Sequence, residues 1–415
     1  MKHMDINNFN SWAKNHIFDE NRFDSDGFII MENDKNYKST GIIAKIFEDH
    51  WDDYYSKYKT TIDSIRPNAN LEIKKVIDCS NHNLGTSVFV CPNDDEVIFS
   101  HHTCKGKLCS SCGIKSQKIK TENILQKCLN VKHRHITFTI PKDLTPWFFD
   151  DLTSNNILFS SVSDTIYSVT NGKIKKSKIR KYLLKYMPGF FAFLHTFGRP
   201  LNFNPHIHVI IAECVIDRNK KFKKLNYFNY DALSKRFMKI LLDKMEKYFG
   251  KKLFRTTKNK MYLNYPNGFY VNNKLEDDGY KFKSIKDLIT YVTRYCSRPV
   301  IAESRIIDYD GTNVTWFYSD HKHDKYHEVK ESAFSFITKI LRHLLPSNFK
   351  SIRYFGFYNK NDKIDSETNK IIKDDKILFR NSLLKWCNSI LTSFNRIPIK
   401  CPKCGHLMDY VFEVS

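Results

Sequence analysis

The stretch Asn204-Pro205-His206-Ile207-His208-Val209-Ile210-Ile211-Ala212 decides the fold, because it puts two histidines one residue apart at the start of an apolar, β-branched run. This composition predicts a strand. Side chains of a strand alternate between its faces, so His206 and His208 share one face while Ile207 and Val209 share the other. Two adjacent imidazoles suit a divalent metal ion. A pair of core histidines is the alternative, and this stretch alone does not decide between them.

The chain contains two more His-x-His pairs, so the context of each pair matters. His133 and His135 flank an arginine just ahead of an expected strand, ITFTI. His321 and His323 lie in a charged stretch, HKHDKYHE, that is typical of a solvated turn. The pair at 206 and 208 is distinguished by the apolar residue between its members and by the apolar strand that follows. Of the three pairs, it is therefore the best candidate for a metal site, although core histidines stay an equal alternative on these local grounds.

A third metal ligand is needed, and the sequence offers three candidates. The segment GFFAFLHTFG is expected to pair with the His-x-His strand as an antiparallel hairpin, which favours its His195. Asp287 is a second candidate. Glu213 is off parity with the two histidines, so without a β-bulge it faces the other side of the sheet. A core role for His195 is an equally good interpretation.

A helix is predicted around Tyr291-Val292-Thr293-Arg294-Tyr295. Its two tyrosines are four residues apart, which makes them neighbours on one helical face. In a chain with 22 tyrosines, such a pair is more often part of a core than of a catalytic site. The pattern alone does not assign a function.

Four ordered segments together resemble the two-tyrosine HUH transposases of the insertion sequence ninety-one family. The segments are VCPNDDEVIFSHHTCKGKLCSSCG, GFFAFLHTFGRPLNFNPHIHVIIAE, YVTRYCSRPVIAESRI and IRYFGFY. The resemblance extends from about residue 46 to the CPKCG near residue 401. It implies an α+β fold, in which an antiparallel, RRM-like HUH nuclease sheet with helices on one face follows a zinc-binding module. It also implies that Tyr291 and Tyr295 attack single-stranded DNA while Mg²⁺ or Mn²⁺ is bound by His206 and His208. His195, favoured by the expected hairpin, is the third ligand in this interpretation.

The cysteines predict a zinc site, because a CxxC pair with further thiolates nearby fits tetrahedral coordination. The expected ligands are Cys91, Cys104, Cys109 and Cys112, with Cys79 as a further member. The family pattern has a cysteine where this chain has Asp94, so Asp94, His101 or His102 are alternative ligands. The pair Cys401 and Cys404 has no second pair nearby in sequence. It is expected to join Cys79 or a histidine, or to bind nothing.

Charge favours a nucleic-acid partner, since 67 Lys and Arg against 45 Asp and Glu give a formal net charge of +22. The resemblance implies that the zinc module binds DNA, and the expected DNA-binding residues are Lys105, Lys107, Lys115, Arg294 and Arg298. No Walker-type motif is present, so a helicase would be a host protein. The sequence has no apolar leader and no membrane-spanning run, which predicts a location in the bacterial cytoplasm without a membrane partner.

The expected domains are a helical preface (1–78), the zinc module (79–120), the nuclease domain with its tyrosine helix (130–310) and a C-terminal helical region (311–415). Three alternatives remain open. One is a rolling-circle replication initiator or a relaxase on the same scaffold. Another is a non-catalytic zinc-ribbon DNA-binding protein, in which the histidines and tyrosines belong to the core. The third is an inactive, decayed element, which Asp94 in place of the family's cysteine keeps open.

Overall fold

The structure is a computed structural model that describes residues 3–4, 8, 41–93, 96–129, 131–149, 151–171, 184–219, 221–225, 228–272, 284–320, 325–359, 385–395 and 397–414. The chain divides into two compact units. One comprises residues 1–119, 297–341 and 379–415, and the other comprises residues 120–296 and 342–378. Within the described ranges, no helix combines the length and apolar character needed to cross a membrane.

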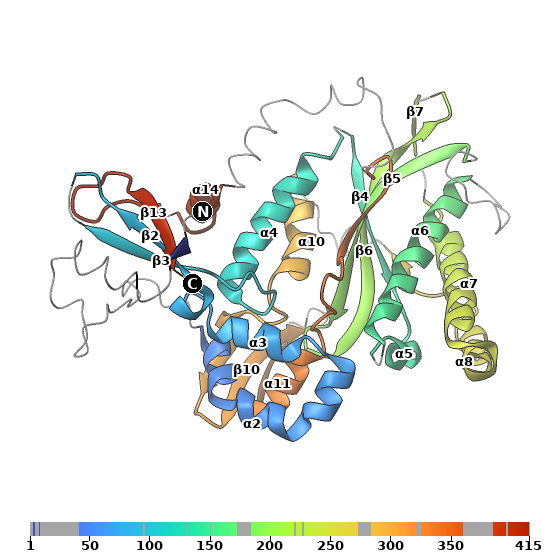
Figure 1. Ribbon diagram of the computed structural model, residues 1–415. Coiled ribbons are helices and arrows are strands. Elements are labelled where there is room, and N and C mark those ends of the chain that lie inside the picture. Colours follow the sequence, from blue (N-terminus) through green and yellow to red (C-terminus); the bar gives the residue numbers. More distant parts are fainter. Residues whose placement is uncertain are drawn as a thin grey trace. The chain divides into compact units, whose positions relative to one another are not determined.

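The second unit is built on an antiparallel sheet of long and short strands. Their order is β12-β5-β6-β4-β8, with β7 paired to β6 (Figure 1). Its strands are β4 (His133–Thr139), β5 (Tyr186–Phe197), β6 (Phe203–Asp217), β7 (Phe222–Lys224), β8 (Val271–Asn272) and β12 (Ile352–Gly356). The expected hairpin of β5 with β6 is present. β12 comes from beyond residue 310, where the nuclease domain was expected to end.

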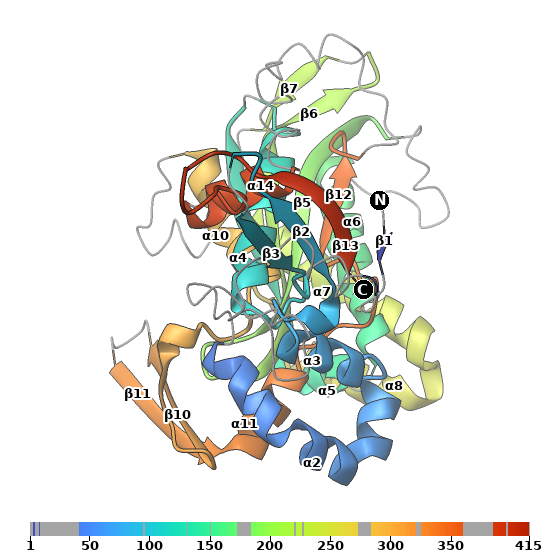
Figure 2. The same ribbon diagram turned by 60° about the vertical axis from the view of Figure 1, so that its left-hand side comes forward.

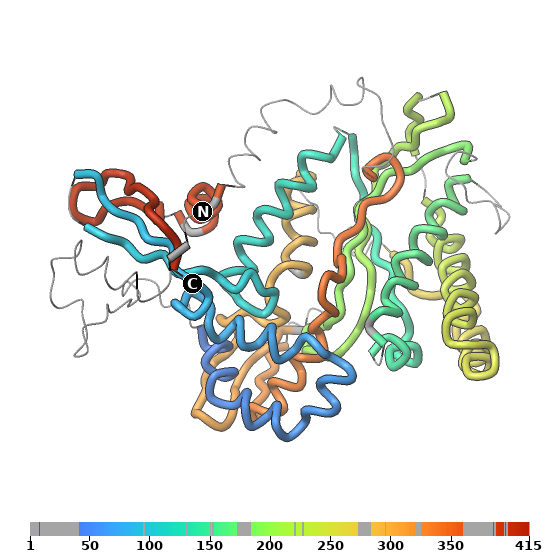
Figure 3. The backbone as a smooth tube through the Cα atoms, in the orientation of Figure 1, coloured from blue at the N-terminus to red at the C-terminus, as the bar shows by residue number. Residues whose placement is uncertain are grey.

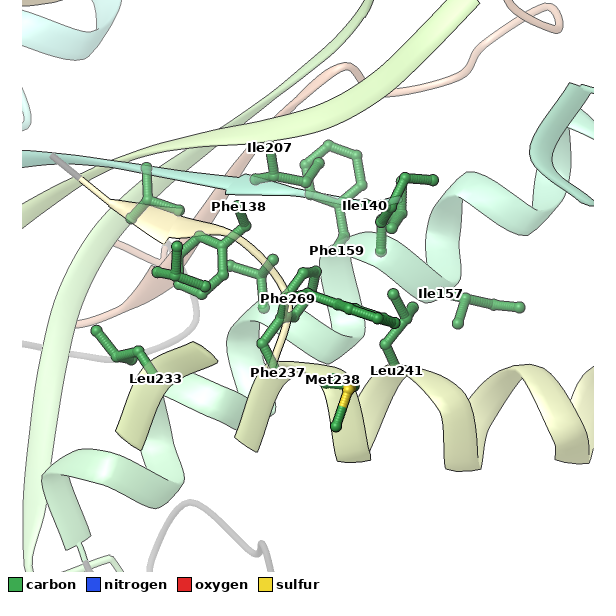
Figure 4. Packing of buried hydrophobic residues seen from close by; sticks show 14 of the residues in the cluster. Phe138, Ile140, Ile157, Phe159, Ile207, Leu233, Phe237, Met238, Leu241 and Phe269 are labelled. Carbon is green, nitrogen blue, oxygen red and sulfur yellow. The ribbon is translucent and has the colours of Figure 1, made fainter. Parts of the chain in front are cut away.

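Helices cover both faces of this sheet, whereas the resemblance implied helices on one face only. Four helices belong to one side: α5 (Thr145–Phe149), α6 (Asn155–Asn171), α7 (Tyr230–Phe249) and α8 (Lys251–Asn264). Their buried side chains pack with Phe138 and Ile207 of the sheet (Figure 4). The other face packs against α10 (Ile285–Ser297) and the end of α4 (Ser110–Leu125), through Ile124, Leu288 and Val292.

The sequence of β5 explains why both faces are covered. Phe190, Ala192 and Leu194 belong to the α6–α7 side, while Phe191 and Phe193 belong to the α10 side. Every residue from 189 to 196 is buried. Because apolar residues occupy both parities of the strand, leaving either face in water would expose large aromatic side chains.

The first unit contains a four-stranded sheet in the order β1-β13-β2-β3. The strands are β1 (His3–Met4), β2 (Thr86–Val90), β3 (Val97–His101) and β13 (Asp409–Val414). The red β13 runs beside the light-blue β2 in Figures 2 and 3, although more than 300 residues separate them in sequence. The zinc module expected at 79–120 therefore includes a strand from the region that was expected to be helical.

The same unit also contains further helices and a small second sheet. The helices are α2 (Ile42–Ile65), α3 (Ala69–Ile77), α11 (Ala333–Leu341) and α14 (Trp386–Phe394). Tyr54 of α2 stacks edge-on against Phe334 of α11, with ring centroids 5.2 Å apart. The second sheet joins β9 (Ile306–Tyr309), β10 (Asn313–Asp320) and β11 (Lys325–Ser332).

Candidate active site

Three histidines meet on the α10 side of the sheet because of strand register. His195 of β5 lies directly opposite His206 of β6, and His208 follows two residues later on the same face. One ring nitrogen from each histidine lies within 4.8 Å of the corresponding nitrogens of the other two. The ring centroids of His195 and His208 are 4.1 Å apart. The sheet thus brings together the three histidines expected as metal ligands.

Hydrogen bonds orient these rings. His206 Nδ1 lies 2.7 Å from the Asn204 carbonyl oxygen, which leaves Nε2 directed at the other histidines. Nε2 of His206 and Nε2 of His208 are 3.1 Å apart. The His195 ring hydrogen-bonds the backbone of Val292 in α10. The helix that carries the two tyrosines therefore contacts the histidine group directly.

Burial keeps these imidazoles neutral. Desolvation is the largest cause that lowers the pKa of His206 from its usual 6.5, and it holds the pKa values of His195 and His208 well below that value. Charge repulsion from neighbouring histidines adds to the effect at His195 and His208. The neutral form is the one that ligates a metal ion, so the arrangement is suited to coordination at neutral pH.

A fourth histidine, His135 of β4, supports the group and was not expected from sequence. Its Nε2 lies 2.7 Å from Nδ1 of His208, and the two rings stack with centroids 4.9 Å apart. Burial lowers the pKa of His135 to about 4. The alternation in HRHITFTI could have predicted this position. His135 has the parity opposite to that of the apolar residues Ile136 and Phe138, so its side chain belongs to the other face of the sheet.

The other two candidates for a third ligand lie elsewhere. Glu213 is buried and forms an ion pair with Arg134, whose Nε is 3.0 Å from the carboxylate. Its position in β6 has the parity of Ile207, as expected, and not that of His206. Asp287 is exposed in the first turn of α10. Neither residue belongs to the histidine group.

The tyrosine helix α10 packs on the histidine face of the sheet. Leu288, Ile289 and Val292 are buried there, and Tyr291 is half-buried against the same cluster. Tyr295 lies one turn later in α10, but its side chain is outside the described residues. Buried Thr293 bonds Thr121 of α4, with 2.7 Å between the hydroxyl oxygens, so the helix is also held to α4.

The expected zinc residues separate into two groups. The sulfurs of Cys79, Cys104, Cys109 and Cys112 form one set, with distances of 3.8 Å from Cys79 to Cys112, 3.6 Å from Cys79 to Cys109 and 3.6 Å from Cys104 to Cys112. Four zinc-bound sulfurs with bonds of about 2.3 Å would lie about 3.8 Å apart. Hydrogen bonding, first to Cys104, lowers the pKa of the Cys79 thiol to about 7.

Cys91 does not join that set, which corrects the ligand list expected from sequence. Its sulfur lies 3.4 Å from that of Cys404, and the two form a second group with Cys401. The physical reason is the strand pairing of β13 with β2, which brings the CPKCG segment to the end of β2. Asp94, an alternative ligand, lies outside the described residues. His101 and His102 bond the Thr86 and Ser87 hydroxyls, respectively, and neither belongs to a cysteine group.

The residues expected to bind DNA differ in exposure. Lys105 and Arg294 are exposed, whereas Lys107 and Lys115 are half-buried. Burial lowers the pKa of Lys115. Arg298 is half-buried, and its Nε donates a 2.6 Å hydrogen bond to the Gln117 side chain.

Comparisons with known proteins agree with this combination of sites. Residues 46–140 match the family described as "Transposase zinc-binding domain", and residues 189–364 match the family described as "Putative transposase". The chain is 25% identical over 362 residues to "Transposase for insertion sequence element IS801" of Pseudomonas savastanoi pv. phaseolicola, covering 83% of each chain. It is 24% identical over 293 residues to "Putative transposase y4qJ" of Sinorhizobium fredii, covering 67% of this chain and 71% of that one.

These matches define a transposase with a zinc-binding domain. More specifically, the chain belongs to the insertion sequence ninety-one family of transposases, as the order of its motifs implied. No solved structure matches it with comparable significance.

Proposed function

We propose that this transposase cleaves and rejoins single-stranded DNA at the ends of its element through a 5′-phosphotyrosine intermediate, on an RRM-like HUH nuclease sheet. One observation carries the proposal. Three neutral histidines converge on one face of the sheet, and His195 hydrogen-bonds the backbone of the helix that contains Tyr291 and Tyr295. A candidate metal-binding group and the helix that contains the two candidate nucleophiles thus lie on one face of this sheet.

The donor set fits a divalent ion. His206, His208 and His195 each offer a ring nitrogen, and the His206 and His208 nitrogens that face each other are 3.1 Å apart. Imidazole donors favour Mn²⁺ or another transition ion over Mg²⁺, which prefers oxygen. When bound, such an ion would polarise the scissile phosphate and offset the negative charge that develops in the transition state.

The chain's own nucleophile would be a tyrosine hydroxyl. With an ordinary pKa of about 10, only about one tyrosine in a thousand is ionised at neutral pH, so the site must favour the phenolate. The phenolate oxygen of Tyr291 or Tyr295 forms a bond to phosphorus while the bond from phosphorus to the 3′ oxygen breaks. The tyrosine proton is lost and the departing oxygen gains one. Attack by a 3′-hydroxyl reverses the step, so the covalent link conserves the energy needed for rejoining.

Two tyrosines provide for two strands, since one can hold a cleaved strand while the other attacks the next. Tyr291 and Tyr295 are four residues apart in the sequence of α10, a spacing at which positions are neighbours on one helical face. Arg294 lies exposed between them in sequence and would contact the DNA backbone.

The first cysteine group would hold a structural zinc ion. Cys79, Cys104, Cys109 and Cys112 supply four sulfurs at the separations that tetrahedral zinc requires. We further propose that this module binds DNA through Lys105, Lys107 and Lys115, and that Arg298 assists. The net charge of +22 supports a polyanionic partner. A host helicase is a further expected partner.

A covalent-adduct assay tests the proposal. Purified protein is mixed with Mn²⁺ or Mg²⁺ and labelled single-stranded DNA from the element's ends, then run on a denaturing gel. The wild type should form a metal-dependent adduct, and the Tyr291→Phe/Tyr295→Phe variant should form none. Tyr326→Phe, which changes an exposed tyrosine on β11, is the matched control and should behave as wild type.

The same assay separates the alternatives. A non-catalytic DNA-binding protein would bind this DNA but form no adduct in any variant. A replication initiator or relaxase would form the adduct but would not join the element's ends to a second, unrelated strand. Strand transfer to such a target is therefore measured alongside cleavage.

A further inference from the structure

The second cysteine group draws its members from opposite parts of the sequence. Cys91 directly follows β2, whereas Cys401 and Cys404 lie in the turn that precedes β13. The sulfurs of Cys91 and Cys404 are 3.4 Å apart, and all three sulfurs lie within 4.8 Å of one another. The family match for the zinc-binding domain ends at residue 140 and does not include the last two cysteines.

The turn Cys401-Pro402-Lys403-Cys404-Gly405 has the backbone of a metal-binding knuckle. Backbone amides of Cys404 and Lys403 hydrogen-bond the Cys401 sulfur. The Gly405 amide donates a 3.0 Å bond to the Cys401 carbonyl, and Gly405 has a φ of +75°, in the left-handed region. The hairpin closes with a 2.8 Å bond from the Cys401 amide to the His406 carbonyl.

Neither a disulfide nor a hydrophobic core accounts for this group. A sulfur–sulfur bond measures about 2.05 Å, much less than the 3.4 Å between the Cys91 and Cys404 sulfurs. Cys404 is exposed, so it does not serve as a core residue. Among the described residues, Cys91 and Cys401 share their small buried cluster with Phe89 and Met408, and half-buried Ile98 and Ile399 pack against it. A core of this size gives little stability to the turn by itself.

We propose that Cys91, Cys401 and Cys404 bind a second zinc ion, separate from the four-cysteine site. Thiolates are preferred zinc ligands, and the 3.4 Å separation is close to the value of about 3.8 Å expected for two sulfurs on one ion. The three cysteines leave one of the four coordination positions for another ligand. The ion fastens the CPKCG turn to the end of β2, so the zinc-binding domain is completed by a segment that follows the transposase match in sequence.

Zinc content tests the proposal. All variants are made in full-length protein carrying His206→Ala and His208→Ala, so that ions on the histidines do not enter the count. After removal of loosely bound metal, this parent should retain two zinc ions per chain. Cys401→Ser/Cys404→Ser should retain one. Cys387→Ser, a half-buried cysteine outside both groups, is the control and should retain two. Equal zinc content in the double-serine variant and the parent would overturn the proposal.

A second measurement does not depend on how the serine variant folds. Native protein is treated with N-ethylmaleimide before and after a zinc chelator, digested with trypsin and analysed by mass spectrometry. Cleavage after Lys403 separates Cys401 from Cys404. Because Cys404 is exposed, a free thiol there reacts at once, whereas a zinc-bound one reacts only after chelation. Labelling of Cys404 at the same rate with and without chelator would contradict a metal site.

Discussion

The contact between His135 and His208 leads to a prediction about metal affinity. If His208 ligates through Nε2, its Nδ1 carries the proton and donates to Nε2 of His135, 2.7 Å away. His135→Leu removes this acceptor and leaves the buried N–H group with only the more distant Thr137 hydroxyl, 3.4 Å away. Loss of such a supporting partner typically weakens metal binding 10- to 100-fold, which corresponds to about 1.4–2.8 kcal/mol.

The assay is a titration of Mn²⁺ against adduct formation, with the concentration for half-maximal adduct as the readout. His135→Leu should shift this concentration 10- to 100-fold upward, and saturating Mn²⁺ should restore most of the activity. His133→Leu is the matched control. His133 lies on the same strand face, half-buried where His135 is buried, and its ring contacts the Val131 carbonyl and the Tyr358 hydroxyl instead. Unchanged Mn²⁺ dependence in His135→Leu, or an equal shift in both variants, would refute the reasoning.

Two further predictions concern stability. Gly356 has a φ of +59°, and a Cβ there would lie 1.5 Å from the Pro188 carbonyl oxygen. In denaturant unfolding, Gly356→Ala should therefore lower the free energy of unfolding by more than about 2 kcal/mol. Gly311→Ala, with a φ of +86° but open space, should lose only about 1 kcal/mol, and an equal loss in both variants would contradict the steric argument. Burial lowers the pKa values of His133 and His135 from 6.5 to about 4. As the pH falls, both histidines therefore become protonated in the unfolded chain at a higher pH than in the folded protein. The free energy of unfolding of the metal-free protein should be constant above pH 6.5 and should fall by at least about 2 kcal/mol per pH unit near pH 5. An unfolding free energy that stays constant from pH 6.5 to 4 would count against neutral buried histidines.

Local periodicity was sufficient to predict the part of the site that lies on adjacent strands. The alternation in NPHIHVIIA put His206 and His208 on one face, and the short connection to GFFAFLHTFG predicted the hairpin that sets His195 opposite His206. The same parity argument correctly removed Glu213. It also applied to His135, but the arginine between His133 and His135 suggested a polar approach to the strand and not a strand already in the sheet.

Features that depend on distant pairing were not predictable from the sequence. The strand β13 reaches β2 across more than 300 residues, so Cys91 was assigned to the nearest cysteines and not to Cys401 and Cys404. The edge strand β12 is likewise supplied from beyond the expected nuclease domain. Helices on both faces of the sheet follow from the apolar residues at both parities of β5, but which helices cover each face is a matter of tertiary packing.

The most direct test of the central claim is to identify the residue that becomes linked to DNA. Trypsin cleaves after Arg294, between the two tyrosines, and yields one peptide of residues 287–294 with Tyr291 and another of residues 295–305 with Tyr295. After reaction with single-stranded end DNA and digestion of protein and DNA, tandem mass spectrometry should find a 5′-phosphonucleotide on one or both of these peptides. A linkage on any other residue, or no linkage from protein that cleaves this DNA, would contradict the account.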